Sequence, residues 1–345
     1  MSLVLDILIA LFIFSVLIFI HELGHFVAAI KCGVKVLEFA LGMGPIIWSK
    51  QTSLTKYSIR AIPMGGFCSM LGDEDPDNSQ MEGSVYAISP LKRMLIMASG
   101  SIMNFISAFL IFMAIFSITG TDSSTYLAAA TPGWPAYEAG MREGDKIIAI
   151  NGAQISQWEE VTGSLAQNTP GDLYTIQVKK PTGETATYTI TPALDESTGA
   201  YRFGIQSKVV FKFTSAVKNS FFAIGAYVAA VVGALKAVIT GVMSVGEVFS
   251  GPIGVTAEIG RQVTNGMLPM LMIAAGLAVS LGFVNLLPLP ALDGSRIVFA
   301  FIEWVKGSPV NKSWESRIHY VGFMLLIVFA IYIAFNDIAN LVRGP

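Results

Sequence analysis

The sequence predicts an α-helical polytopic membrane protein with about four transmembrane helices and an inserted α+β domain. Hydrophobic residues make up 53% of the 345-residue chain and charged residues only 13%, whereas a soluble domain carries roughly 25% charged residues. Several apolar runs are long enough to cross a hydrocarbon core of about 30 Å, which takes roughly 20 helical residues. Between two of these runs lies a stretch of short alternating strands and turn signals.

The overall composition argues against a nucleic-acid-binding protein and against a disulfide-stabilised one. The formal net charge of −2 gives no basic surplus, so we expect no nucleic-acid partner. Two cysteines, Cys32 and Cys68, provide no disulfide framework. The N-terminal apolar run has neither a preceding positive region nor a small-residue cleavage site, so it predicts a retained helix instead of a removed signal peptide.

Apolar runs divide the chain into membrane segments and loops. The predicted transmembrane segments are residues 1–30, 92–119, 264–290 and 317–340. A further apolar stretch, Phe221–Val242, is ambiguous because it is rich in alanine and glycine and contains Lys236.

Residues 121–210 are predicted to form the inserted domain. Tyr174–Val178 and Thr187–Ile190 have the alternating pattern of half-buried strands. The turn dipeptides Asn151-Gly152 and Thr182-Gly183 are flanked by strand-like runs, which is typical of hairpins.

Positive charges predict the topology. Residues 31–91 and 291–316 are expected to form loops on the cytoplasmic side, because short cytoplasmic loops carry an excess of lysine and arginine. The basic residues in and beside these loops are Lys31, Lys35, Lys50, Lys56, Arg60, Lys92, Arg93, Arg296, Lys306, Lys312 and Arg317. Both termini and the inserted domain are then expected outside the cytoplasm.

The clearest chemical motif is His21-Glu22-Leu23-Gly24-His25 within the first apolar run. The chain has three histidines, and two of them lie here, four positions apart and therefore on one face of a helix. Such a pair can ligate a single metal ion, and Glu22 beside it can act as general base on a metal-bound water. The alternative is a helix end whose polar side chains reach the membrane interface, but three ionisable groups at membrane depth favour the metal site.

A catalytic zinc site needs a third protein ligand. The segment Asn285–Gly294 ends the third span with two prolines, which break the helix, followed by Asp293. Irregular backbone at that depth is tolerated where it is buried or lines a cavity, and Asp293 is therefore the favoured third ligand. An ordinary Asp-Gly turn is the alternative for this motif, and His319 is the rival ligand.

Together these motifs resemble the site-2 protease family. The HELGH pentad and the later Asn-x-x-Pro-x-Pro-x-Leu-Asp-Gly run occur in the family's order, and Ala139–Gly152 is similar to the conserved run of PDZ domains. The resemblance is to the bacterial RseP/RasP-type branch with a single PDZ domain. It implies an intramembrane zinc metalloprotease with one Zn²⁺ per chain. The implied ligands are His21, His25 and Asp293, with Glu22 as catalytic base, and the implied substrate-binding residues are Asn285, Pro288 and Pro290.

The resemblance also implies a membrane-associated β-hairpin around Ile62–Phe67, whose Gly65 and Gly66 would offer a strand edge to substrate. A substrate helix must unwind before hydrolysis, and its freed backbone groups need partners in lipid. The alternative is a Gly-Gly turn that makes no contacts. Asn104 in the second span matches the family as a further substrate-binding residue, whereas Gly100-Ser101 replaces its usual Gly-Pro.

The inserted domain is implied to be an extracytoplasmic PDZ domain with Phe203, Gly204 and Ile205 as its carboxylate-binding loop. The family's place is the bacterial cytoplasmic (inner) membrane. Its partners are the lipid bilayer and single-pass membrane proteins that have first been cut outside the membrane, such as anti-sigma factors or signal-peptide remnants.

Residues 213–262 are predicted to lie on the membrane surface as amphipathic or re-entrant helices. If Phe221–Val242 crossed the bilayer, Asp293 would emerge on the opposite face from His25, and one metal ion could not bind both. Two other function classes stay open: a PDZ-bearing scaffold without activity, and a metal transporter. Intact His21, Glu22, His25 and Asp293 argue against the scaffold, and the few polar groups in the other spans argue against the transporter.

Overall fold

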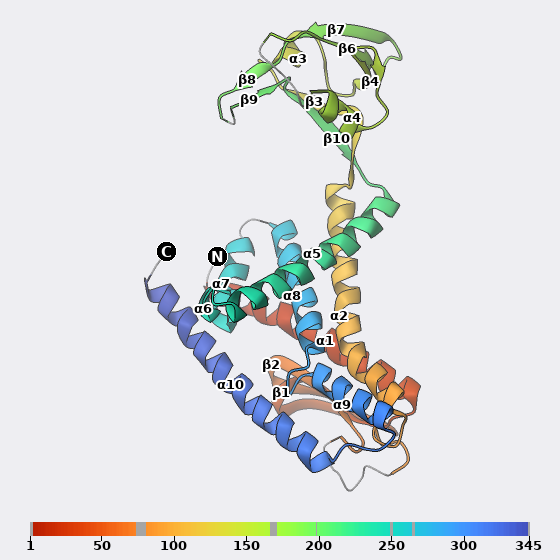
Figure 1. Ribbon diagram of the computed structural model, residues 1–345, viewed down its shortest axis with the longest axis vertical. Coiled ribbons are helices and arrows are strands. Elements are labelled where there is room, and N and C mark those ends of the chain that lie inside the picture. The colour runs from red at the N-terminus through yellow and green to blue at the C-terminus, as the bar shows by residue number, and fades with distance from the viewer. Residues whose placement is uncertain are drawn as a thin grey trace. The chain divides into compact units, whose positions relative to one another are not determined.

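The computed structural model describes residues 3–73, 81–165, 171–197, 199–248, 251–263 and 266–343. The chain divides into two compact units: a helical unit, Met1–Ile115 with Ser220–Pro345, and an inserted unit, Phe116–Asn219. Figure 1 shows the helices of the first unit and the strands of the second. The predicted starts of two spans, residues 1 and 264, lie outside the described residues.

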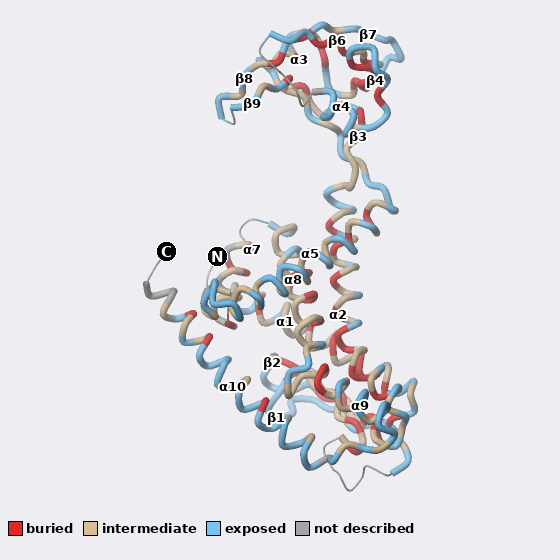
Figure 2. Tube along the Cα trace, in the orientation of Figure 1, coloured by how far each residue is buried: buried red, intermediate tan, exposed pale blue. Residues whose placement is uncertain are grey.

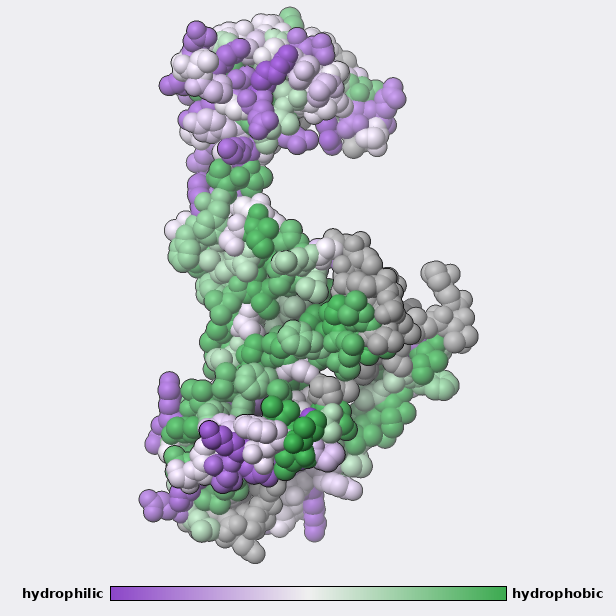
Figure 3. Space-filling model, turned by 180° about the vertical axis from the view of Figure 1, so that it is seen from behind, coloured by the Kyte–Doolittle hydropathy of each residue, from purple (hydrophilic) through white to green (hydrophobic). Residues whose placement is uncertain are grey.

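Long apolar helices make up most of the helical unit. Within the described ranges, five helices are long and apolar enough to cross a membrane. They are α1 (Leu3–Cys32), α2 (Pro90–Thr119), α5 (Phe213–Ile239), α8 (Met267–Leu286) and α10 (Lys312–Arg343). Apolar side chains dominate the visible surface of this unit (Figure 3), as a lipid environment requires. The predicted class, a polytopic helical membrane protein, is confirmed.

Helix α5 is nearly as apolar as the four predicted spans. It is followed by two short helices, α6 (Val245–Val248) and α7 (Pro252–Val263). Length and composition cannot distinguish a spanning helix from one that lies in the interface plane. The surface location of residues 213–262 therefore stays a prediction.

A long antiparallel hairpin, β1 (Val36–Gln51) and β2 (Lys56–Met70), packs against α1. Both strands bend, so that residues 36–41 pair with 66–70 on one side, and residues 38–41 pair with 56–59 on the other. The aromatic ring of Phe39 lies 5.5 Å from that of Phe19 and 4.9 Å from that of Phe26, and these contacts hold the sheet to α1. A hairpin is present in the predicted region, but Ile62–Phe67 lies within strand β2 and the connecting turn is formed by residues 52–55, so Gly65-Gly66 is not the turn. Its association with the membrane stays a prediction.

The inserted unit is an α+β domain with its own core. Its main sheet has the strand order β10-β3-β4-β6-β7, with β5 paired to β4, and a separate hairpin joins β8 to β9. The strands are β3 (Asp122–Ala130), β4 (Lys146–Ile150), β5 (Ala153–Gln154), β6 (Tyr174–Lys179), β7 (Thr185–Ile190), β8 (Ala193–Asp195), β9 (Ala200–Arg202) and β10 (Ile205–Val210). Two short helices, α3 (Pro135–Glu138) and α4 (Trp158–Leu165), complete the unit.

Sequence signals account for much of this unit. The predicted strands coincide with β6 and β7, whose inward side chains Tyr174, Ile176, Val178 and Ile190 are buried. Asn151 and Gly152 adopt φ values of 49° and 83° between β4 and β5, the left-handed conformation that a two-residue hairpin turn requires.

Candidate metal centre

Helix α1 places His21, Glu22 and His25 beside α2. The two histidines are 6% and 5% exposed. The Nδ1 atom of His25 lies 2.8 Å from the carbonyl oxygen of Ile96 on α2. When Nδ1–H donates to that oxygen, the Nε2 lone pair of His25 is free for a metal ion.

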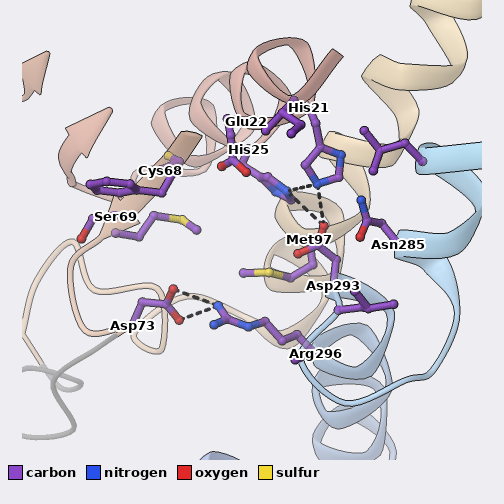
Figure 4. Close-up of a pocket in the computed structure, with 16 residues that line it drawn as sticks. His21, Glu22, His25, Cys68, Ser69, Asp73, Met97, Asn285, Asp293 and Arg296 are labelled. Carbon is purple, nitrogen blue, oxygen red and sulfur yellow. Dashed lines mark hydrogen bonds and ion pairs between the residues drawn. The ribbon is translucent and has the colours of Figure 1, made fainter. Parts of the chain in front are cut away.

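Asp293, the first residue of α9 (Asp293–Lys306), completes the group. Its Oδ2 atom lies 3.0 Å from Nε2 of His21 and 3.1 Å from Nε2 of His25, and the two Nε2 atoms are 3.2 Å apart (Figure 4). Ligands about 2.0–2.1 Å from a tetrahedral zinc ion are separated by about 3.3–3.4 Å. The donor set and its spacing therefore fit Zn²⁺.

Two glycines allow this close approach of α1 and α2. A Cβ atom at Gly24 would collide with the carbonyl group of Ser99, and one at Gly100 would overlap both imidazole rings. Gly100 is one of the buried residues of α2, and the buried positions of this helix are red in Figure 2. In the sequence, Gly100 stands out only as part of a departure from the family pattern, because a single chain does not show which helix faces meet.

Asn104 contacts the other nitrogen of His21. It is fully buried, and its side-chain nitrogen lies 3.2 Å from Nδ1 of His21. Within the described residues its Oδ1 atom is buried without a partner. When Nε2 of His21 binds a metal ion, Nδ1 carries the proton and needs a hydrogen-bond acceptor. Asn104 supplies this acceptor when its side-chain amide is flipped, so that Oδ1 faces Nδ1. Asn104 was predicted to bind substrate, and the structure places it against a candidate ligand.

A cavity of about 340 Å³ opens beside the three donors. Glu22 lines it, and its carboxylate accepts a hydrogen bond from the backbone N–H of Cys68 on β2. Asn285, in the last turn of α8, projects toward His21 and Asp293 (Figure 4). The cavity thus brings together the predicted base, the predicted ligands and one of the predicted substrate-binding residues.

Four other predicted substrate-binding residues are not among the described residues that line this cavity: Gly65, Gly66, Pro288 and Pro290. A Cβ atom at Gly66 would press on the carbonyl oxygen of Ala40 and lie 3.5 Å from Cγ of Glu22. Gly65 adopts φ 88° and packs on Met43. Pro288 is exposed in the turn that follows α8.

Two ionisable groups on the cavity wall, Cys68 and Arg296, were not among the predicted site residues. Burial, with the negative charges of Glu22 and Asp73, raises the pKa of the Cys68 thiol to about 12. The Asp73 carboxylate holds the pKa of Arg296 above its usual range. Both residues line the cavity, and no local sequence signal places them there.

In the inserted unit, Phe203, Gly204 and Ile205 border a separate cavity of about 420 Å³ beside α4. Phe203 is buried with its ring 5.2 Å from that of Tyr174. Gly204 adopts φ 73°, and a Cβ atom there would collide with Trp134. The predicted carboxylate-binding loop therefore lies on a cavity wall, and its role stays a prediction.

Two histidines, a carboxylate and an adjacent glutamate among apolar helices define a membrane-embedded metalloprotease. The family model described as peptidase family M50 matches residues 9–329. The chain belongs to this family, the site-2 protease family. The predicted family membership and the predicted metalloprotease activity are confirmed.

Relatives match along nearly the whole chain. A candidate zinc metalloprotease of Clostridium perfringens is 34% identical over 334 residues, covering 96% of this chain and 98% of the relative. The zinc metalloprotease RasP of Geobacillus kaustophilus is 27% identical over 94% of this chain and 96% of its own. The regulator of sigma-W protease RasP of Bacillus subtilis is 28% identical over 95% and 97%.

Among solved structures, the PDZ domain of an SdrC-like protein from Listeria monocytogenes is similar to part of this chain. It is 22% identical and covers 25% of this chain and 87% of its own, with a TM-score of 0.22.

Proposed function

We propose that this protein is a zinc endopeptidase that hydrolyses peptide bonds within transmembrane segments of other membrane proteins. His21, His25 and Asp293 are the proposed ligands of one Zn²⁺ per chain. The observation that carries the proposal is that three donor atoms lie 3.0–3.2 Å from one another. Two of them belong to His21 and Asp293, which are 272 positions apart in the chain.

Glu22 is the proposed general base. A bound zinc ion would lower the pKa of a coordinated water toward 7 and polarise the carbonyl group to be attacked. The Glu22 carboxylate takes up the proton of the attacking water and returns it to the leaving amine. The Cys68 backbone N–H orients that carboxylate toward the cavity.

The hairpin is the proposed binding surface for the unwound substrate. Residues 66–70 pair with β1 on one side, and their other edge lies near Glu22, so its backbone groups can pair with an extended segment. Asn285 stands across the cavity and can bond to the same segment. Gly65, Gly66, Asn104, Pro288 and Pro290 are the other proposed substrate-site residues.

Single-pass membrane proteins, first cut outside the membrane, are the proposed substrates. Anti-sigma factors and signal-peptide remnants are candidates, and a relative named as a regulator of sigma-W protease favours the first. The inserted unit, placed outside the cytoplasmic membrane, would bind new C-termini at Phe203, Gly204 and Ile205. A non-spanning segment 213–262 is consistent with Asp293 and His25 lying at one depth.

The test is Glu22→Gln, which removes the base and leaves the three donors intact. Membrane-protein fragments should accumulate in cells of the variant as uncut precursors, while purified protein keeps its zinc content and thermal stability. Unchanged fragment patterns in the two strains would contradict the proposal and favour a scaffold. For the segment 213–262, Lys236→Cys should react with an impermeant thiol reagent from outside the cell, and reaction only from the cytoplasm would contradict a surface location.

A further inference from the structure

The turn that delivers Asp293 contains an unusual backbone conformation. Ala291 has φ +74°, in the left-handed region that favours glycine and is costly for a side chain. It lies two residues before the proposed ligand. A turn with such a residue needs other contacts to hold it.

The backbone donors of residues 287–292 can be accounted for one by one. Leu287, Leu289 and Leu292 donate to carbonyl groups of the same region, at 3.0, 2.7 and 3.1 Å. The two prolines have no N–H. The remaining donor is the N–H of Ala291, the residue with the strained φ.

His319 on α10 accepts that hydrogen bond. Its Nδ1 atom lies 3.1 Å from the Ala291 nitrogen. Because the backbone N–H donates, Nδ1 must be the unprotonated nitrogen, and the proton of neutral His319 is on Nε2. Nε2 is buried without a partner among the described residues, and the ring lies 5.7 Å from that of Phe299.

One turn further along α10, Gly322 brings the helix directly onto the same turn. A Cβ atom there would collide with Pro290. Two residues of α10 thus contact two neighbouring residues of the turn, one by a hydrogen bond and one by close packing.

We infer that His319 is a positioning residue that fixes the Pro290–Ala291 turn and thereby sets the Asp293 carboxylate for zinc. The inference rests on the proposed function, in which Asp293 is a ligand. It gives a role to the third histidine, which stands outside the group of His21, His25 and Asp293. Groups that orient a metal ligand typically change metal affinity by about 10–100-fold when they are removed.

The experiment measures zinc affinity by chelator competition on the full-length protein in detergent, with kcat as a second readout. His319→Phe keeps a ring but removes the acceptor, and it should weaken zinc binding by about 10–100-fold. His319→Asn places an amide oxygen near the position of Nδ1 and should stay within about threefold of wild type. The matched control is Tyr320→Phe on the next, 64% exposed residue of α10, which should change nothing.

Two further variants separate positioning from a general loss of packing. Ala291→Gly allows positive φ without strain, so His319→Phe should weaken zinc binding less in that background than in wild type. Gly322→Ala displaces Pro290 without altering His319, and it should also weaken zinc binding. Equal losses from His319→Phe in both backgrounds would overturn the inference.

Asp293→Ala distinguishes this inference from the proposed function. If Asp293→Ala retains wild-type zinc affinity, the proposed ligand set is wrong. If Asp293→Ala loses zinc but His319→Phe binds it as tightly as wild type, the ligand set stands and the positioning role of His319 is wrong.

Discussion

Arg296 on α9 is joined to Asp73, the residue three positions beyond strand β2, by both oxygens of the Asp73 carboxylate. They lie 2.7 and 2.8 Å from Nη1 of Arg296 (Figure 4). Arg296 follows Asp293 by one helical turn, and both residues of the pair line the cavity. The ion pair therefore connects the end of the hairpin to the helix that carries the proposed third ligand.

Asp73→Asn should destabilise this connection. It leaves the guanidinium of Arg296 without its charged partner, at a cost of about 1–3 kcal/mol for a pair that is only partly buried. We expect a lower thermal unfolding midpoint in detergent and reduced proteolytic activity. The exchange variant Asp73→Arg/Arg296→Asp should recover part of the stability, and a loss equal to the sum of its two single variants would show that the pair does not couple the two elements.

Gly100→Ala should strongly weaken metal binding while leaving the helices intact. Its methyl group would occupy the space of the two imidazole rings, so we expect roughly 100-fold weaker zinc binding or more. The control is Gly225→Ala on α5, where a Cβ atom meets no atom within 4 Å. Zinc measured per protein in the purified variants is the readout, and equal zinc in both would contradict the packing of α2 against His21 and His25.

The part of the candidate site on α1 could be predicted from the sequence, because the relative placement of its two histidines depends only on their spacing along a helix. A spacing of four residues on a helix is enough to bring two imidazoles to one face, and His21 and His25 lie as that spacing requires. Asp293 was predicted from a motif that breaks a helix at membrane depth, and it meets them.

Long-range packing explains what the sequence could not predict. The contacts of Gly100 and Asn104 with the histidines depend on which faces of α1 and α2 meet, and apolar composition is similar on all faces of a membrane helix. The pairing of Asp73 with Arg296 joins residues 223 positions apart. Helix α5 illustrates the same limit, because its apolar length fits both a span and an interfacial helix.

The hairpin should loosen in acid through Glu38 on β1. Burial acts to raise the pKa of Glu38, but hydrogen bonds from Ser58 (2.5 Å) and Arg60 (2.7 Å), with the charges of Arg60 and Lys56, hold it below its usual value. Because the folded-state pKa is depressed, the stabilisation is complete above about pH 4.5 and is lost as the pH falls through the lowered value.

Hydrogen exchange of the hairpin amides, corrected for intrinsic rates, measures this effect. Protection in β1 and β2 should fall between pH 5 and 3 in the wild type. Glu38→Gln should remove the pH dependence and show weaker protection at pH 7. A wild-type hairpin whose protection is constant over that range would contradict the role of Glu38.

Cys68 should react slowly with alkylating reagents although it lines the cavity. With its pKa at about 12, the thiolate fraction at pH 8 is about 10⁻⁴, and after allowing for the greater nucleophilicity of a more basic thiolate the reaction should be about 50-fold slower than for an ordinary cysteine. The measurement uses Cys32→Ser, in which Cys68 is the single cysteine, and the reference is this variant unfolded in denaturant. The modified fraction is followed by mass spectrometry. Since the thiol stays protonated throughout, the folded-state rate should rise about tenfold per pH unit from pH 7 to 10. A rate that levels off between pH 8 and 9 would mean that the Cys68 thiol is solvated and is not buried beside Glu22 and Asp73.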